Sequence, residues 1–174
     1  MQIGKVWLGA LSLSTAVACS PILDWREFQP EGSGAVVSFP CRPDRHARNV
    51  VVAGVSTRME MWVCEAGEAT YALSFINVAD LPGANAALAD LRAVAAANLG
   101  SAVATPSALH VPGMTPNPQT ARVALAGHRP DGTPIEQQAA FFSKGQRVYQ
   151  ASVVGTKLSA DAFDMFFAAL RLPL

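Results

Sequence analysis

The chain has 174 residues, enough for one domain whose core is large enough to fold without a metal or a mesh of disulfides. Hydrophobic residues make up 51% of it and charged residues 15%, a balance that excludes an intrinsically disordered chain. Lys plus Arg equals Asp plus Glu, at 13 each, so no overall positive charge attracts nucleic acid, and we expect no nucleic-acid partner.

Residues 1–18 have the pattern of a secretory signal peptide. Lys5 supplies a positive charge, residues 6–18 are apolar or small throughout, and Asp24 is the first acidic residue. The apolar run of about thirteen residues is shorter than the roughly 20 that cross a bilayer as a helix. An exported protein is therefore favoured over one with a transmembrane anchor.

The end of this segment fits two processing routes. Ala16-Val17-Ala18 has the A-x-A form of an ordinary cleavage site. With Cys19 the same residues resemble a bacterial lipobox, whose cysteine becomes the lipidated first residue, although Ala16 stands where Leu is usual. We favour lipidation because three cysteines leave Cys19 over once Cys41 and Cys64 are paired. By resemblance to Gram-negative sorting rules, Ser20 indicates the outer membrane.

Cys41 and Cys64 are expected to form a disulfide, since exported proteins fold in an oxidising compartment. The bridge would close a loop of about two dozen residues and add about 3 kcal/mol of stability in the chain-entropy model. The alternative is a pair of buried thiols.

Residues 19–34 are predicted to be a lipid-anchored tether, followed by a single α+β domain over residues 35–174. The run Gly32-Ser33-Gly34 interrupts regular structure. Within the tether, Trp25 and Phe28 are expected to pack as a single turn on the edge of the domain. The alternative is an exposed aromatic pair that contacts a partner or a lipid surface.

A short strand is predicted at residues 35–39, ended by Pro40. Residues 41–48 have the composition of a polar, turn-rich loop that contains a local basic cluster: Arg42, Arg45, His46 and Arg48. This loop could bind a phosphate or carboxylate of a ligand or partner. A solvated loop that includes Asp44 is the simpler interpretation.

Further strands are predicted by alternating side chains at residues 49–64, with a break near Ala53-Gly54, and at residues 69–78, 120–127, 134–142 and 146–154. In the second of these, large residues alternate with Ala72 and Ser74, which indicates a sheet covered on both faces. Residues 101–119 are expected to be irregular, with one short strand near residues 108–111.

Two helices are predicted. The first begins with Asp80 as its cap and Pro82 in its first turn, and it ends at Gly100. The second begins at Ser159 and carries four large side chains at i, i+3, i+4 and i+7 that share one buried face: Phe163, Phe166, Phe167 and Leu170.

The sequence contains no recognisable catalytic or metal-binding constellation. His46, His110 and His128 lack a second His or a Cys at metal-ligand spacing. The motifs of P-loop, dinucleotide-binding, zinc-protease and serine-hydrolase sites are also absent from the sequence. We therefore expect a protein that is not an enzyme and has no metal or cofactor. A hydrolase of unrecognised type is the less favoured alternative, because a triad need not be adjacent in the chain.

Five motifs resemble the PsbP-like group of small exported bacterial domains over nearly the whole mature chain: Trp25-x-x-Phe28, Val37–Pro40, Tyr71–Phe75, Gly145–Tyr149 and Phe163–Leu170. The resemblance implies a mostly antiparallel β-sheet flanked by helices, an α/β/α sandwich. It also implies a non-enzymatic binding or assembly role, often with a lipid anchor. Core positions carry the resemblance, so no binding residue is transferred from it.

These observations predict a membrane-anchored accessory or binding module at the periplasmic face of the cell envelope, with an envelope protein as its partner. The alternative is a carrier of a small apolar ligand. A closed apolar cavity lined by Met59, Met61 and Phe75 would favour the carrier.

Overall fold

The computed structural model describes residues 23–101 and 106–173. The predicted signal peptide and Cys19 lie outside these residues. Along the described chain the elements are β1 (Arg26–Phe28), β2 (Val37–Phe39), β3 (Asp44–Val52), β4 (Val55–Ala66), β5 (Ala69–Asn77), α1 (Leu81–Asn98), β6 (Ala121–His128), β7 (Pro134–Lys144), β8 (Arg147–Gly155) and α2 (Ala160–Ala168).

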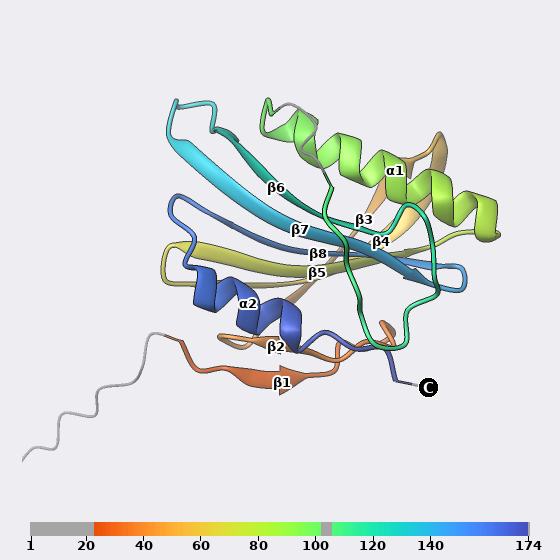
Figure 1. Ribbon diagram of the computed structural model, residues 1–174, viewed down its shortest axis with the longest axis horizontal. Helices are drawn as coiled ribbons and strands as arrows, with labels where there is room; N and C mark the ends of the chain where they lie inside the picture. The colour runs from red at the N-terminus through yellow and green to blue at the C-terminus, as the bar shows by residue number, and fades with distance from the viewer. Residues whose placement is uncertain (1–22, 102–105, 174) are drawn as a thin grey trace, which may run out of the picture.

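The main sheet has six antiparallel strands in the order β3-β4-β5-β8-β7-β6 (Figure 1). Two three-stranded meanders, β3–β5 and β6–β8, meet where β5 pairs with β8. A second, two-stranded sheet is formed by β1 and β2. The prediction of an α+β domain built mainly from antiparallel sheet is confirmed.

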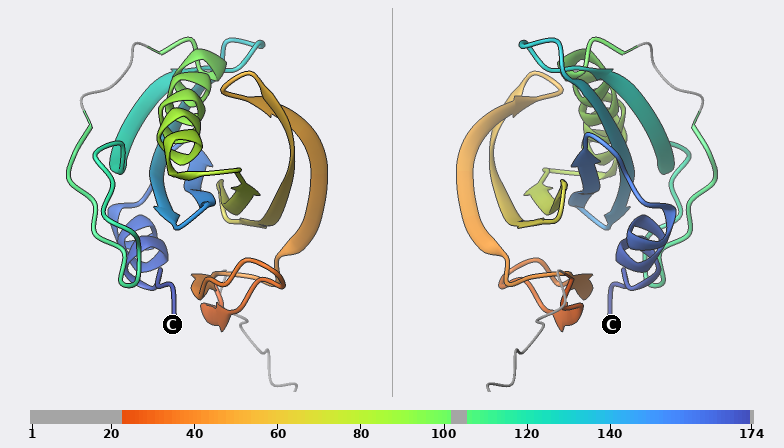
Figure 2. Two further views of the ribbon diagram at one scale, coloured as in Figure 1. Left: turned by 90° about the vertical axis from the view of Figure 1, so that its right-hand side faces the viewer. Right: turned by 90° about the vertical axis from the view of Figure 1, so that its left-hand side faces the viewer.

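The sheet is strongly curved, and its two faces are covered differently (Figure 2). Helix α1 lies on the concave face, where its Ala84, Leu88 and Leu91 are buried. Helix α2 and the β1–β2 sheet cover the convex face, where Phe39 and Phe166 are buried in an aromatic core. The alternation of large and small residues in β5 therefore predicted the two-sided cover correctly.

Helix α1 begins as predicted. The Asp80 carboxylate accepts a hydrogen bond from the Gly83 N–H at 2.7 Å, and Pro82 lies in the first turn. In α2 the predicted buried face is confirmed for Phe166 and for Leu170, which follows the helix. The Phe163 side chain lies outside the described part of the structure.

The β3–β4 hairpin turns back at Ala53-Gly54, the break predicted from sequence. Both residues have positive φ angles, 50° and 76°, as a two-residue hairpin turn of the primed type requires. The Ala53 N–H donates a hydrogen bond of 2.8 Å to the Asp90 carboxylate on α1. This bond ties the tip of the hairpin to the helix across the concave face of the sheet.

The domain begins ahead of the predicted boundary at residue 35. Ser33 is fully buried, and its carbonyl oxygen accepts hydrogen bonds from the Tyr149 hydroxyl at 2.6 Å and from the Arg147 guanidinium at 3.0 Å. The Asp24 N–H also donates to the Pro40 carbonyl at 2.9 Å. Much of the predicted tether is therefore part of the fold.

The predicted turn at Trp25–Phe28 is wrong, because these residues enter strand β1, in which Arg26 pairs with Phe39 of β2. Trp25 packs edge-on against Tyr71 with ring centroids 5.6 Å apart. The aromatic pair is thus packed on the convex core. The predicted strand near residues 108–111 is also wrong, since described residues 106–120 form only an isolated bridge between Ser107 and Arg122.

Candidate binding cleft under helix α1

A cleft of about 180 Å³ lies between α1 and the concave face of the sheet. Strands β3 and β4 and helix α1 form its walls, and strands β5, β7 and β8 form its floor. The small Ala72 and Ser152, which pair across β5 and β8, leave space under the helix. The volume is more than ten times the ~10–15 Å³ that a cavity needs to hold one water molecule. We call this space the α1 cleft.

The floor of the α1 cleft is polar and uncharged. Ser74 faces Gln150 across β5 and β8, and Ser152 and Gln137 continue the row on β8 and β7. Ser74, Gln137 and Ser152 are each only 6% exposed. The Ser74 hydroxyl donates a hydrogen bond to the main-chain carbonyl of Gln150 at 3.3 Å. The side chains of Gln137 and Ser152 make no hydrogen bond within the described part of the chain, and so they are available to a ligand.

The walls of the cleft are mostly aliphatic, with Asn98 at the end of α1 as a polar exception. Met59 and Met61 project from β4, and Leu91, Val94 and Ala95 project from α1. Methionine side chains are flexible and polarizable, so such a wall can adapt to ligands of different shape. Val94 is 44% exposed at the mouth. The cleft therefore combines hydrogen-bonding groups below with an adaptable apolar surface on its sides.

Charge lies at the mouth of the cleft. Arg48 is exposed on β3 and forms no ion pair with another described residue. Asp90, on the opposite wall, holds Ala53 through its carboxylate. The cleft thus places one accessible cation beside an uncharged interior.

The closed apolar cavity expected for a carrier is not what the structure contains. Met59 and Met61 line the α1 cleft, but Phe75 lies on the convex face, between Trp62 at 5.8 Å and Tyr149 at 6.2 Å. Phe75 does not reach the cleft because successive residues of a pleated strand face opposite sides of the sheet. Phe75 pairs with Glu60, which places it out of phase with both methionines.

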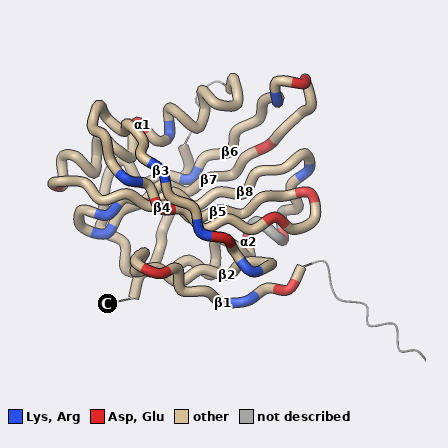
Figure 3. The backbone as a smooth tube through the Cα atoms, turned by 180° about the vertical axis from the view of Figure 1, so that it is seen from behind, with Lys and Arg blue, Asp and Glu red and all other residues tan. Residues whose placement is uncertain are grey.

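The prediction that the basic residues lie in a loop is also wrong, because Arg45, His46 and Arg48 lie in strand β3. Neighbouring residues of a strand face opposite sides of the sheet. Arg42 lies in the bend before this strand. Only Arg48 is brought to the α1 cleft. In Figure 3 charged residues of both signs are scattered along the strands and turns.

Arg45 is held in an ion-pair network on the convex side. Its guanidinium lies 3.2 Å from Glu31, 3.1 Å from Glu60 and 5.5 Å from the centre of the Trp62 ring. Arg58 also binds Glu60, at 3.0 Å. The hydrogen bond from Arg58, supported by Arg45, lowers the pKa of the Glu60 carboxyl. Arg45 therefore anchors the edge strand β3 to its neighbours.

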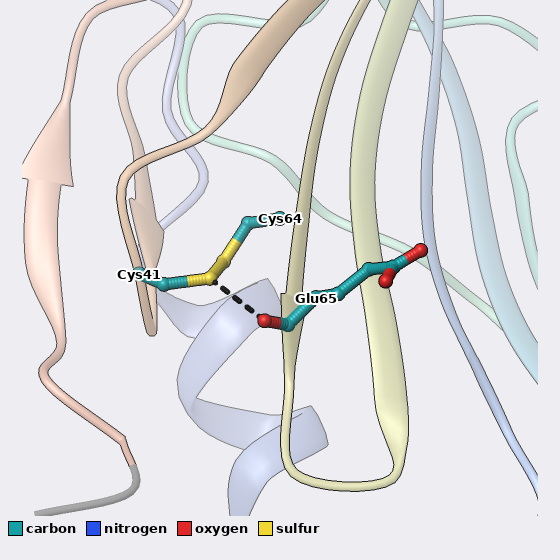
Figure 4. Close-up of a disulfide and its surroundings, with 3 residues drawn as sticks. All are labelled: Cys41, Cys64 and Glu65. Carbon is teal, nitrogen blue, oxygen red and sulfur yellow. Dashed lines mark hydrogen bonds between the residues drawn. A yellow bond between two sulfur atoms is a disulfide. The ribbon is translucent and has the colours of Figure 1, made fainter.

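A disulfide joins Cys41 and Cys64, with Cα atoms 5.9 Å apart, and this confirms the predicted pairing (Figure 4). It ties the bend before β3 to strand β4. The Cys41 sulfur lies 3.3 Å from the Glu65 carbonyl oxygen. Because a disulfide sulfur carries no proton, this contact becomes a hydrogen bond only if the bridge is reduced.

His46, His110 and His128 are all exposed and none of them lines the α1 cleft, although His46 pairs with the cleft residue Met61 across β3 and β4. Within residues 23–101 and 106–173, no three His, Cys, Asp or Glu side chains are grouped so that they could hold a metal ion. Neither of the described helices is both long and apolar enough to span a bilayer.

The floor residues Gln137, Gln150 and Ser152 were not predicted as a site. A signal is nevertheless present in the sequence: these polar residues are in phase with Ala139 and Phe141 in strands predicted to be covered on both faces. Polar residues at such positions face either a partner or a cavity. The pairing of β7 with β8, which brings them together, required the structure.

No family model matches the sequence, and no curated protein matches it. A comparison with solved structures aligns the chain with a crystal structure from Bacteroides thetaiotaomicron VPI-5482, at 14% sequence identity and a TM-score of 0.42. The alignment covers 87% of this chain and 42% of that protein, so the chain spans less than half of its length.

Proposed function

We propose that the protein is a non-enzymatic binding module of the cell envelope that holds a small molecule in the α1 cleft. The observation that carries this proposal is the row of buried polar side chains on the cleft floor. Gln137 and Ser152 make no hydrogen bond within the described chain, and their side chains line the open cleft instead of being sealed from solvent. A ligand in the cleft can therefore supply hydrogen-bond partners to both.

The proposed location of the protein is the periplasmic face of the outer membrane, with Cys19 as the lipidated residue. The signal-like residues 1–18 and the Cys41–Cys64 disulfide support export to an oxidising compartment. From Cys19 to Leu23 the chain spans at most about 14 Å. The β1 side of the domain would therefore lie at the membrane surface, and the α1 cleft, on the opposite face of the main sheet, would face away from it.

We also propose membership of the PsbP-like group and an accessory role beside an envelope protein. The antiparallel sheet with a helix on each face supports the proposed sandwich. Crosslinking in membranes of the native organism, followed by purification of the chain, tests the partner. Recovery of the same protein in repeated experiments is expected, and the absence of any reproducible partner would contradict the accessory role.

The cleft itself is tested by screening small fragments against the purified protein with ligand-observed NMR. Ser152→Leu places an isobutyl group on the cleft floor, and we expect it to remove the binding of fragments that bind the wild type. Gln138→Leu is the matched control, because Gln138 lies on the opposite face of β7. Fragments that bind all three proteins equally would show that the α1 cleft is not the binding site.

Lipidation at Cys19 is tested by treating cells with globomycin, which blocks processing of lipidated precursors. An accumulated precursor of the wild type is expected, and Cys19→Ala should abolish both lipidation and this response. An unchanged processing pattern in treated cells would contradict lipidation at Cys19.

A further inference from the structure

We infer that the ligand of the α1 cleft is an uncharged aliphatic amide of about a dozen non-hydrogen atoms, such as a short peptide-like molecule. This inference rests on the proposed binding function and specifies its ligand. Three features of the cleft carry it: the chemistry of the floor, the chemistry of the walls, and the position of the charged groups.

The floor offers paired donors and acceptors. Gln137 and Gln150 each present an amide with a carbonyl acceptor and an NH₂ donor in one plane. The Ser152 hydroxyl can donate or accept, and the Ser74 hydroxyl, which donates to the Gln150 main chain, can still accept. A primary carboxamide in the ligand has the same paired arrangement and can exchange two hydrogen bonds with one glutamine, whereas a trans secondary amide can accept from one floor side chain and donate to another. The row extends over three strands, β5, β8 and β7, and therefore suits a ligand with more than one amide.

The walls select an aliphatic body. None of the described residues that line the cleft is aromatic. Sugar rings and nucleobases, which are commonly bound by stacking on aromatic side chains, thus have no stacking surface here. Met59, Met61 and Leu91 instead provide aliphatic contacts for a branched hydrocarbon side chain.

The position of charge argues for an uncharged ligand. The ionisable residues that line the cleft are Arg48 and Asp90, both at its mouth, and the Asp90 carboxylate already accepts the Ala53 N–H. A charged group that reached the floor would lose its hydration without meeting an opposite charge, which is strongly unfavourable. A neutral amide loses less hydration free energy when it enters the cleft. The polar side chains of the floor then replace the hydrogen bonds that it made to water.

The test is a titration of the ¹⁵N-labelled purified protein with N-acetyl-L-leucinamide, an aliphatic molecule with two amides. Saturable shifts are expected for amide resonances of β5, β7, β8 and α1, with a Kd near the millimolar range for a ligand of this size. Gln137→Leu should weaken binding at least tenfold. Gln138→Leu, the same change on the other face of β7, should leave the Kd within twofold.

Three comparison probes separate the ligand class from the function: N-acetyl-L-leucine, octanoate and methyl α-glucoside. Weaker shifts with all three would support the neutral amide. If one of them binds the cleft more tightly than the diamide and loses binding in Gln137→Leu, the ligand class is wrong and the binding function stands. If no probe shifts the cleft resonances, both the ligand class and the proposed binding function are contradicted.

Discussion

Gln137 shows how a single residue can favour binding at the expense of stability. Its side chain is 6% exposed and makes no hydrogen bond within the described chain, although Ala139 and Phe141 on the same face of β7 belong to the core. An apolar residue would pack at this position without loss of hydration. The presence of glutamine is therefore explained better by a ligand than by folding.

The residue-scale prediction concerns Gln137→Leu. Leucine makes apolar contacts with the cleft walls where glutamine presents a polar amide without a protein partner, and this should raise the free energy of unfolding by about 1 kcal/mol. Urea denaturation of the ligand-free protein measures this change. Gln138→Leu should change stability less, and a clear loss of stability in Gln137→Leu would mean that the amide supports the fold.

At the scale of elements, the walls of the α1 cleft belong to two separate parts of the chain. The β3–β4 hairpin forms one wall and α1 the other, and the hydrogen bond from Ala53 to Asp90 joins them. The width of the cleft therefore depends on a contact that lies outside its floor.

Asp90→Ala should release the tip of this hairpin. Losing the acceptor should cost about 1 kcal/mol and speed hydrogen exchange at the Ala53 amide roughly fivefold, because 1 kcal/mol is about that factor in a local opening equilibrium. Asp90→Asn is the matched variant, since its amide oxygen still accepts. Equal exchange rates at Ala53 in all three proteins would show that the bond does not hold the tip.

The second element-scale prediction concerns the disulfide. Reduction, or the double change Cys41→Ser with Cys64→Ser, should lower the free energy of unfolding by about 3 kcal/mol, because the open chain gains conformational freedom. Chemical denaturation with and without reductant measures the effect. After unfolding without reductant, Cys41 and Cys64 should be unreactive in a thiol count, and two reactive thiols from them would contradict the bridge.

At the scale of the whole molecule, the proposed anchor defines an orientation. Trp25 is separated from Cys19 by at most about 22 Å of chain. It packs on the convex side, whereas Val94 on α1 belongs to the concave side. In the lipidated protein on vesicles, the face that carries β1 should therefore be the one near the lipid.

Brominated lipids, which quench nearby tryptophans, test this orientation. In the Trp62→Phe variant the fluorescence reports Trp25 in the mature chain, and quenching is expected. The matched variant carries three changes: Trp25→Phe, Trp62→Phe and Val94→Trp. Its introduced indole should be quenched much less than Trp25 is in the Trp62→Phe variant. Equal quenching of the two variants would contradict the orientation.

Local patterns predicted the fold to different degrees. Alternation identified the strands of the main sheet apart from the first half of β3, which was predicted as a loop, and a capping residue with a proline identified the start of α1. Pairings between distant segments were not visible: nothing local in Arg26 indicates that it pairs with Phe39, nor that Gln137 and Ser152 line one space. The prediction of a basic loop was wrong for a related reason, because strand β3 places Arg45 on the face opposite to His46 and Arg48.

Strand β3 ends the main sheet, and in the described structure its outer N–H and C=O groups have no neighbouring strand. Unpaired backbone groups at the edge of a sheet can pair with a strand from a second copy of the chain, which can start a fibre. Asp44, Arg45 and Arg48 interrupt this edge with charge, and the curl of the hairpin turns it away from a flat approach. The arginines interpreted from sequence as a binding loop thus have a second consequence: they help to keep copies of the protein apart when it is concentrated.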